Sequence, residues 1–262
     1  RKGEKLALIG ENGAGKTTLV KLLCGLYPVS SGKITIQGTE VSRGQADFIR
    51  DQVAVLFQDA LVLPYTVAEN VSLKPLEETD QNQVWAALEQ AGLSERIKQE
   101  PNGILTQMTK AVSGDGISLS GGEAQKLLMA RMLYHKSAQI WILDEPTAGL
   151  DPAGRDEILG LVSKMHRELG ITILLVSHSM EDVAEYVDRI IVMNHGAVMF
   201  DALPKQVFAH YKELEAVGLA APQVTYLVHE LAERGLPVDT QATTAKEAAQ
   251  TILSALREKN VI

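Results

Sequence analysis

The stretch LALIGENGAGKTTLVKLL, residues 6–23, constrains the fold of this chain more than any other part of the sequence. Residues 6–9 form an apolar run that predicts a buried strand, and residues 18–23 are apolar at helical spacing. Between them, residues 10–17 fit the pattern G-x-x-x-x-G-K-[ST]. A glycine-rich loop that joins a strand to a helix points backbone N–H groups at an anion. The stretch therefore predicts a phosphate-binding loop in an α/β fold.

The residues of this loop have separate predicted roles. Its glycines let phosphate oxygens approach the backbone, the ammonium of Lys16 reaches the β and γ phosphates, and the hydroxyl of Thr17 can bind Mg²⁺. The predicted nucleotide-binding residues are Gly10, Asn12, Gly13, Ala14, Gly15, Lys16, Thr17 and Thr18. A glycine-rich turn with a surface lysine is the structural alternative, and the flanking strand and helix make it the weaker one.

Three later apolar runs predict buried strands, and polar residues follow each of them. These runs are 53–57 before Gln58, 140–143 before Asp144 and Glu145, and 171–176 before Ser177 and His178. Residues just past the carboxyl ends of parallel strands line the ligand crevice of open α/β sheets. We therefore expect Gln58 and Asp144 to meet a magnesium ion and Glu145 to activate a water. We expect His178 at the same sheet edge as Lys16, although a lone histidine is more often structural.

The motif LSGGEAQ, residues 119–125, begins another predicted helix. Ser120 and Glu123 have the spacing of a capping box, which is a purely structural explanation. That explanation does not account for Gly121 and Gly122 in the first turn, where each glycine costs about 1 kcal/mol relative to alanine. Glycines at a helix N-terminus allow a ligand to approach the backbone closely, and an anion fits that position best.

Helix signals predict the domain organisation. Thr66 and Glu69 have capping-box spacing, and Asp80 can cap a second helix. These signals predict a helical subdomain over about residues 66–137, inserted between two strands of the sheet. The main domain is predicted to comprise residues 1–203.

Residues 204–262 are predicted to form a C-terminal helical extension. Pro204 opens a helix toward Gly218, Pro222 opens another, and Thr244 with Glu247 caps a last one. The predicted apolar face of that last helix consists of Ala248, Ile252, Leu253 and Leu256. The extension is either a dimerisation unit or packs on the core, and the sequence slightly favours packing alone.

Composition excludes several classes of protein. The 262-residue chain has a net charge of −8, which argues against non-specific nucleic-acid binding because that needs a basic face. Its single cysteine, Cys24, allows no internal disulfide. We expect no signal peptide, and no apolar run reaches membrane-spanning length, so we expect any action at a membrane to go through a partner.

Five motifs together resemble those of the ATP-binding subunits of ABC transporters, and they stand in that family's order. They are GENGAGKTT as Walker A, Gln58 as the Q-loop, LSGGEAQ as the signature, IWILDEPTAGLD as Walker B with Asp151 in the D-loop, and His178 as the switch histidine. Residues 25–139 are most similar to exporter-type cassettes. From about residue 148 onward, the chain is similar to the ATPase subunit of energy-coupling-factor importers. We weight this second likeness more because generic cassettes lack the extension.

The resemblance implies an ABC cassette, an α/β fold in which helices flank a mainly parallel sheet, with a helical subdomain and a C-terminal helical extension. It implies ATP and Mg²⁺ as ligands, with the metal held by Thr17, Gln58 and Asp144. The implied catalytic residues are Glu145, His178 and Gln58. The signature residues implied to bind the ATP held by the opposite subunit are Ser120, Gly121 and Gly122.

The resemblance also implies partners and a location. The partners are a second ABC ATPase subunit, in a homodimer or a heterodimer, and transmembrane transporter subunits that respond to motion near Gln58. The implied location is peripheral, on the cytoplasmic face of the cell membrane, where the complex imports a vitamin or a metal ion. No nucleic acid is expected as a partner.

Three alternatives stay open at this point. The first is an exporter-type or conventional importer cassette, and the second is a soluble ABC ATPase that acts on ribosomes, DNA or cluster assembly. The third, an unrelated P-loop kinase or GTPase, is disfavoured by the signature and by His178.

Two departures from the family pattern matter. The strands and the adenine-stacking aromatic that usually precede Walker A do not occur in this sequence. Either the sequence is truncated or base stacking comes from elsewhere, and we expect weaker nucleotide affinity and a less stable N-terminal edge. Glu123 replaces a frequent glutamine, which we expect to be tolerated.

Overall fold

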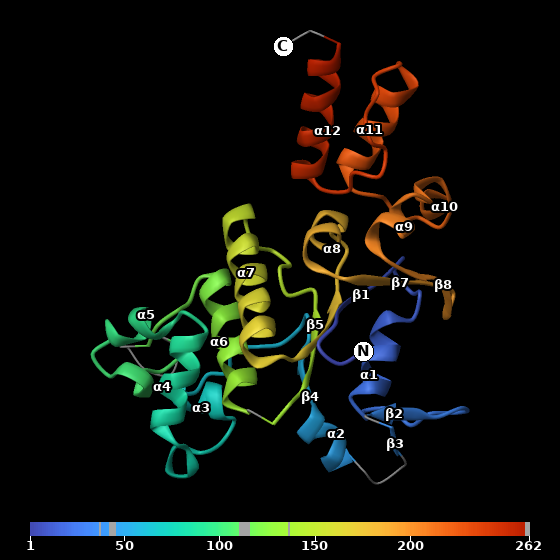
Figure 1. Cartoon of the computed structure of the whole chain (residues 1–262). Helices are drawn as coiled ribbons and strands as arrows, with labels where there is room; N and C mark the ends of the chain where they lie inside the picture. The colour runs from blue at the N-terminus through green and yellow to red at the C-terminus, as the bar shows by residue number, and fades with distance from the viewer. Residues whose placement is uncertain (37, 42–45, 110–115, 136, 260–262) are drawn as a thin grey trace. The chain divides into compact units, whose positions relative to one another are not determined.

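The computed structural model describes residues 1–262 except 37, 42–45, 110–115, 136 and 260–262 (Figure 1). The chain divides into two compact units. The first unit consists of residues 1–21 and 172–262, and the second consists of residues 22–171. No helix in the described ranges is both long and apolar enough to cross a lipid bilayer.

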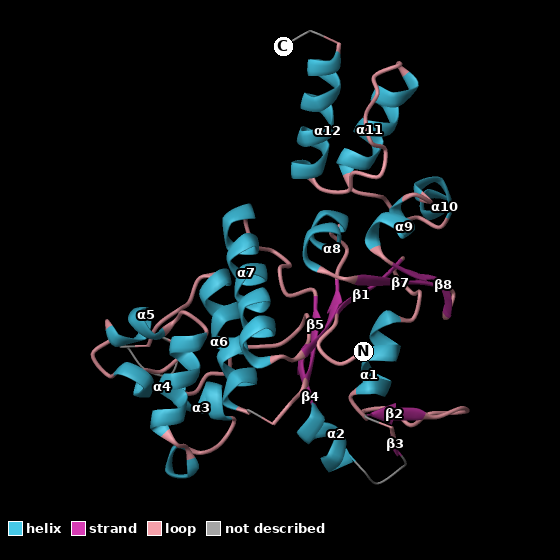
Figure 2. Ribbon diagram, viewed as in Figure 1, coloured by secondary structure: helices cyan, strands magenta, loops and turns pink. Residues whose placement is uncertain are grey.

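The sheet of the first unit is built around strand β1 (Lys5–Gly10). Strand β1 pairs in parallel with β6 (Thr172–Val176) on one side and with β7 (Arg189–Asn194) on the other. Figure 2 labels β1 and β7 among the strands drawn in magenta. Strand β8 (Ala197–Ala202) then runs antiparallel to β7. The interior of β1 is fully buried, as expected for the continuous apolar runs of parallel strands. The strands predicted over 6–9 and 171–176 are therefore confirmed.

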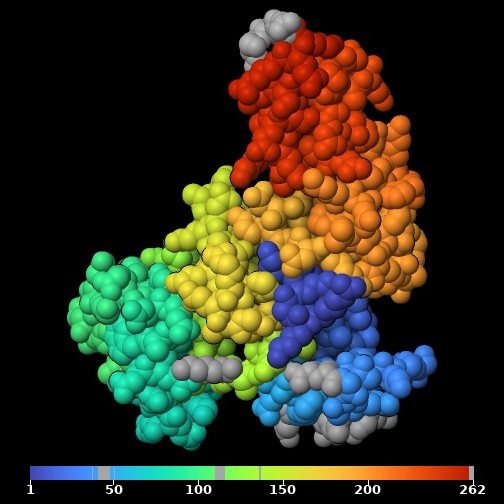
Figure 3. Space-filling view, viewed as in Figure 1, coloured from blue at the N-terminus to red at the C-terminus, as the bar shows by residue number. Residues whose placement is uncertain are grey.

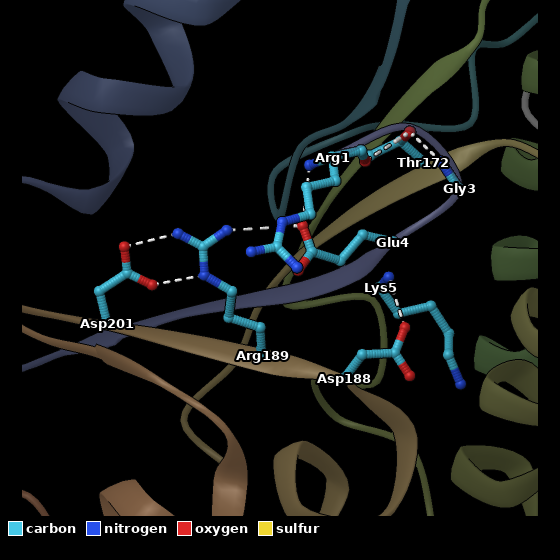
Figure 4. Close-up of polar contacts among 8 residues, drawn as sticks. All are labelled: Arg1, Gly3, Glu4, Lys5, Thr172, Asp188, Arg189 and Asp201. Carbon is cyan, nitrogen blue, oxygen red and sulfur yellow. Dashed lines mark hydrogen bonds and ion pairs between the residues drawn. The ribbon is translucent and has the colours of Figure 1, made fainter.

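Polar contacts hold the first residues of β1 to the neighbouring strands (Figure 4). The guanidinium of Arg189 in β7 forms a fork on Asp201 in β8, with Nη2 2.6 Å from Oδ2, and its Nη1 lies 3.5 Å from Glu4 Oε2. The backbone N–H of Lys5 donates to Asp188 Oδ2 at 2.9 Å. Because β1 is paired on both sides, it is a central strand of this sheet rather than an edge.

The helix predicted to run from Pro204 toward Gly218 is wrong, because the chain forms two short helices there. These are α9 (Pro204–Phe208) and α10 (Tyr211–Ala216). His210 interrupts them with a non-helical backbone, and its ring stacks on Phe200 of β8 with centroids 5.0 Å apart. Phe208 is fully buried, and α9 packs on β7 and β8. Tertiary packing thus overrides the local helical pattern.

The last two helices, α11 (Gln223–Glu233) and α12 (Ala245–Glu258), form a small core of their own. Figure 3 shows their side chains as one closely packed body in red. Its buried residues are Val228, Ala242 and Ala248, with Val224 and Val238 packed against them. The predicted cap is confirmed, because Thr244 accepts a hydrogen bond from the N–H of Glu247.

One predicted member of the α12 face is wrong. Leu253 is 45% exposed, whereas Ala248 and Ala255 are buried. Successive helical residues turn by about 100°, so Leu253 points roughly 140° away from Ala248 while Ala255 returns close to it. The core therefore uses a narrower, smaller-residue stripe than the sequence pattern predicts.

In the second unit, strand β4 (Val53–Leu56) pairs in parallel with β5 (Ile140–Asp144). The short strands β2 (Ile34–Ile36) and β3 (Thr39–Val41) form an antiparallel pair. Several helices lie between β4 and β5, and α3 and α4 pack on α6. The helices of this unit are α2 (Ala46–Gln52), α3 (Val67–Ser72), α4 (Gln81–Gln90), α5 (Ser94–Lys98), α6 (Gly121–Tyr134) and α7 (Pro152–Leu169), with 3-10 turns at Leu76–Glu78 and Gly103–Leu105.

The predicted caps at Thr66 and Asp80 are confirmed. Thr66 and Glu69 form a reciprocal capping box, and Asp80 accepts hydrogen bonds from two backbone N–H groups at the start of α4. Pro152 opens α7, and Gly170 ends it in the left-handed conformation at φ +63°. These signals are local, so the sequence carries them without reference to the rest of the fold.

Candidate functional site

The phosphate-binding loop joins β1 to α1 (Lys16–Leu23) in the first unit. Gly13 and Gly15 have φ values of +84° and +100°, which L side chains rarely adopt. The side chain of Lys16 is buried, and its Nζ donates to the carbonyls of Gly10 at 2.7 Å and Glu11 at 3.1 Å. The ammonium is therefore held against the loop, where it can exchange carbonyl contacts for phosphate oxygens.

The other residues assigned to this loop differ in exposure. Ala14 is buried, whereas Asn12, Thr17 and Thr18 are exposed. The hydroxyl groups of Thr17 and Thr18 are therefore accessible at the start of α1, at the end of the helix that favours anions.

The turn between β7 and β8 packs against the phosphate-binding loop. The N–H of Gly196 donates to the carbonyl of Ala14 at 3.0 Å. A Cβ on Gly10 would lie 2.5 Å from the carbonyl oxygen of Met193, so a glycine is required at position 10 by packing as well as by phosphate approach. Sequence reasoning missed this contact, because nothing local links residues so far apart in the chain.

His178 follows β6, the strand beside β1. Because β1 and β6 are parallel, their carboxyl ends lie at one edge of the sheet, and the structure places His178 at the same edge as the phosphate-binding loop. Ser177 is buried, and its Oγ accepts a hydrogen bond from the N–H of Ser179 at 3.1 Å. Ser179 in turn caps α8 (Met180–Tyr186), so the exposed His178 sits in a well-defined turn.

In the second unit, Gln58 and the acidic pair also share one edge. Gln58 is exposed two residues after β4, and Asp144 is the buried last residue of β5. Leu56 of β4 is in register with Leu143 of β5. Gln58 and the acidic pair therefore lie at the carboxyl ends of two neighbouring parallel strands. Glu145 has a left-handed backbone at φ +51°, uncommon for a residue with a side chain and typical of functional sites.

The signature helix α6 begins with a complete capping box. Glu123 Oε2 accepts hydrogen bonds from the N–H of Ser120 at 2.8 Å and from its Oγ at 2.9 Å. The backbone hydrogen bond from Ser120 is the main cause that lowers the pKa of Glu123, and the charge of Arg96 adds to it. Arg96 Nε lies 3.3 Å from Glu123 Oε1. Sequence reasoning missed Arg96, which lies on α5.

The remaining sequence-predicted site residues in the second unit are the two signature glycines and Asp151. A Cβ on Gly121 would lie 3.2 Å from Leu150 Cδ2, whereas Gly122 faces open space. Asp151 is the N-cap of α7, where its Oδ1 accepts a hydrogen bond from the N–H of Gly154 at 2.8 Å. Among the described residues, no cluster of three His, Cys, Asp or Glu side chains could hold a metal by itself.

Comparison with known proteins gives a consistent result. The profile of the ABC transporter family matches residues 1–148. The energy-coupling factor transporter ATP-binding protein EcfA2 of Clostridium tetani is 36% identical over 99% of this chain and 88% of that protein. The EcfA2 of Symbiobacterium thermophilum is 37% identical over 97% of this chain and 86% of that protein. A putative ABC transporter ATP-binding protein of Methanosarcina mazei is 33% identical over 99% of this chain and 76% of that protein.

A solved structure supports the same fold. The ATP-bound bacterial Atm1-family ABC exporter superposes with a TM-score of 0.69 at 25% sequence identity. The match covers 82% of this chain and 37% of the exporter chain. The shared part therefore has the α/β cassette architecture seen here.

Proposed function

The chain belongs to the ABC transporter ATP-binding proteins, and from that premise we propose that it powers an energy-coupling-factor importer for a vitamin or a metal ion. It is an ATP-hydrolysing transport ATPase with the cassette fold. The observation that carries the importer proposal is the extent of the similarity to EcfA2 proteins, which spans 97–99% of the chain and so includes residues 204–262. We propose residues 1–203 as the cassette, with its helical subdomain at about 66–137, and residues 204–262 as its helical extension.

The proposed mechanism divides one ATP site between two subunits. The phosphate-binding loop and Lys16 hold the phosphates of one subunit's ATP, while Ser120, Gly121 and Gly122 of the other subunit contact its γ-phosphate. Glu145 activates the attacking water and His178 positions it. Phosphoryl transfer depends on positioning and charge neutralisation, which these groups can supply. ATP that contacts both subunits only in the closed dimer shifts the equilibrium toward closure.

The donor set proposed for Mg²⁺ fits the chemistry of that ion. Thr17, Gln58 and Asp144 offer a hydroxyl, an amide and a carboxylate oxygen, and Mg²⁺ binds through one or two carboxylates together with substrate phosphates. Bound there, the ion would neutralise charge on the phosphates. Asp144 is 6% exposed, as expected for a carboxylate that serves a site rather than solvent.

The proposed partners are a second ABC ATPase subunit and transmembrane transporter subunits, with this chain on the cytoplasmic face of the membrane. Recovery of the chain from its native membranes, followed by mass spectrometry, tests this directly. A small multi-span coupling protein together with a substrate-binding membrane protein would support the importer. A single large exporter domain would instead favour the exporter-like segment, residues 25–139, and ribosomal or soluble partners alone would contradict a transport function.

The shared site makes a prediction for Glu145→Gln. Removal of the base should leave ATP binding intact and slow hydrolysis by orders of magnitude, so the closed dimer accumulates. We expect the variant to elute as a dimer with MgATP and as a monomer without it. The control adds Lys16→Ala, which should prevent the dimer because the phosphates lose their main cation. A variant that stays monomeric in saturating MgATP would contradict the shared-site model.

A further inference from the structure

The start of the C-terminal extension contacts the helix that follows His178. We call residues 218–226 the tail root. The backbone N–H of Gln223, the first residue of α11, donates to Glu181 Oε1 at 3.3 Å. Glu181 lies in the first turn of α8, three residues after His178. Helix α8 has only seven residues. A hydrogen bond to its first turn therefore also constrains the adjoining turn that carries His178.

The tail root also forms one wall of a pocket beside His178. The pocket has a volume of about 540 Å³. One wall consists of His178, Met180 and Glu181, and the other of Ala220, Ala221, Gln223 and Tyr226. The hydroxyl of Tyr226 accepts a hydrogen bond from the N–H of Ala221 at 3.1 Å, and its ring packs edge-on against Tyr211. The tail wall is therefore held by a hydrogen bond and a ring contact of its own, and it lines the same pocket as the exposed His178.

A third contact connects the tail root to the phosphate-binding loop. Gly218 has φ +76°, and a Cβ built on it would lie 3.0 Å from both Cδ and Oε1 of Glu11. The side chain of Glu11 thus lies directly against this glycine. The tail root therefore touches the two loops of the first unit that are proposed to face the γ-phosphate.

We propose that the tail root is a positioning element for His178, acting through the hydrogen bond between the Gln223 N–H and Glu181. The proposal rests on the role of His178 in the proposed function. It predicts that the extension tunes the rate of hydrolysis, because the hydrogen bond fixes where α8 begins and so where the imidazole lies relative to the γ-phosphate. Nucleotide binding by the phosphate-binding loop does not depend on that bond.

The chain offers a matched pair of variants at position 223. Gln223→Pro removes the N–H donor, and proline is favoured at the first position of a helix. The preceding residue, Pro222, has φ −54° and ψ 141°, a conformation that a following proline permits. Gln223→Ala removes the side chain but keeps the N–H. We expect Gln223→Pro to lower kcat about fivefold with ATP affinity within about twofold of wild type, and Gln223→Ala to match wild type.

The test measures steady-state ATP hydrolysis and nucleotide affinity of the full chain, with His178→Ala as the reference. A positioning role through His178 requires that Gln223→Pro add no further loss in the His178→Ala background. The proposal would be overturned if the two losses in kcat multiplied in the double variant. It would also be overturned if the Gln223→Pro variant folded and kept wild-type kcat. If His178→Ala alone keeps wild-type kcat, the role of His178 in the proposed function fails instead.

A second pair makes the test independent of folding at position 223. Glu181→Ala removes the acceptor, and Glu181→Gln keeps an oxygen in the same place. We expect Glu181→Ala to reproduce the lower kcat of Gln223→Pro and Glu181→Gln to restore most of the activity. Equal activity of the two variants would overturn the proposal, because a general structural role of α8 predicts no such rescue.

Discussion

At the scale of single residues, Glu123 shows how one side chain serves both the fold and the signature. Its Oε2 fixes the N–H and the hydroxyl of Ser120, while Arg96 approaches its Oε1. The spacing of Ser120 and Glu123 predicts the capping box because its geometry is local. The contact with Arg96 could not be predicted, because it depends on how α5 packs near α6.

We expect Glu123→Ala to lower the free energy of unfolding by about 1 kcal/mol, because Ser120 loses its acceptor. Glu123→Gln keeps an amide oxygen for the box and should lose less. The pKa of Glu123 is lowered from 4.5, so the stabilisation by its charge is complete above that pH and is lost as the pH falls through the lowered pKa. Urea unfolding from pH 7 to pH 3 should show the advantage of wild type over Glu123→Gln disappear in acid. An advantage that persists at pH 3 would contradict this assignment.

At the scale of elements, α6 connects the signature to the segment that follows Gln58. In its second half, Arg131 Nε donates to the carbonyl of Asn70 at 2.8 Å and Nη2 donates to the carbonyl of Leu61 at 3.3 Å. Asn70 is fully buried, and its Nδ2 donates to the carbonyl of Leu63 at 2.9 Å. The helix that presents Ser120 at one end thus orders residues 61–70 near the other.

We expect Arg131→Met to lower the free energy of unfolding by about 2 kcal/mol, because the part-buried carbonyl of Asn70 and the exposed carbonyl of Leu61 lose a charged donor. Lys164→Met is the control, since the exposed pair of Lys164 and Glu168 at 4.0 Å should contribute almost nothing. Guanidinium unfolding of both variants measures the difference. Equal stability of the two variants would show that water replaces Arg131 without cost.

Elements also show which parts of the fold the sequence could predict. Strands β1, β5 and β6 were predictable because a strand that is buried on both faces has a continuous run of apolar residues in its sequence. The break between α9 and α10 was not, because stacking of His210 on Phe200 decides it from outside the segment. The same holds for the bond between Gln223 and Glu181, whose partners are 42 positions apart. The motifs identified the candidate residues, whereas the contacts that position them came from tertiary packing.

At the scale of the whole molecule, the extension has a separate core, and this predicts how the chain loses structure. Val228 is fully buried in the core formed by α11 and α12, so Val228→Ala should cost about 2 kcal/mol there. Because few residues make up this core, we expect faster hydrogen exchange over residues 223–258 while β1 and β7 keep their protection. Exchange measured by mass spectrometry distinguishes the two regions.

The matched control for that experiment is Leu227→Ala, the neighbouring residue on α11 that is 47% exposed, which should leave exchange unchanged throughout. Ile190→Ala, at a fully buried residue near the start of β7, should instead increase exchange across the whole sheet of the first unit. If Val228→Ala also exposed β1 and β7, the extension would unfold together with the sheet. The tail root would then be part of one cooperative unit rather than a separable support for His178, and its effect on hydrolysis would follow overall stability.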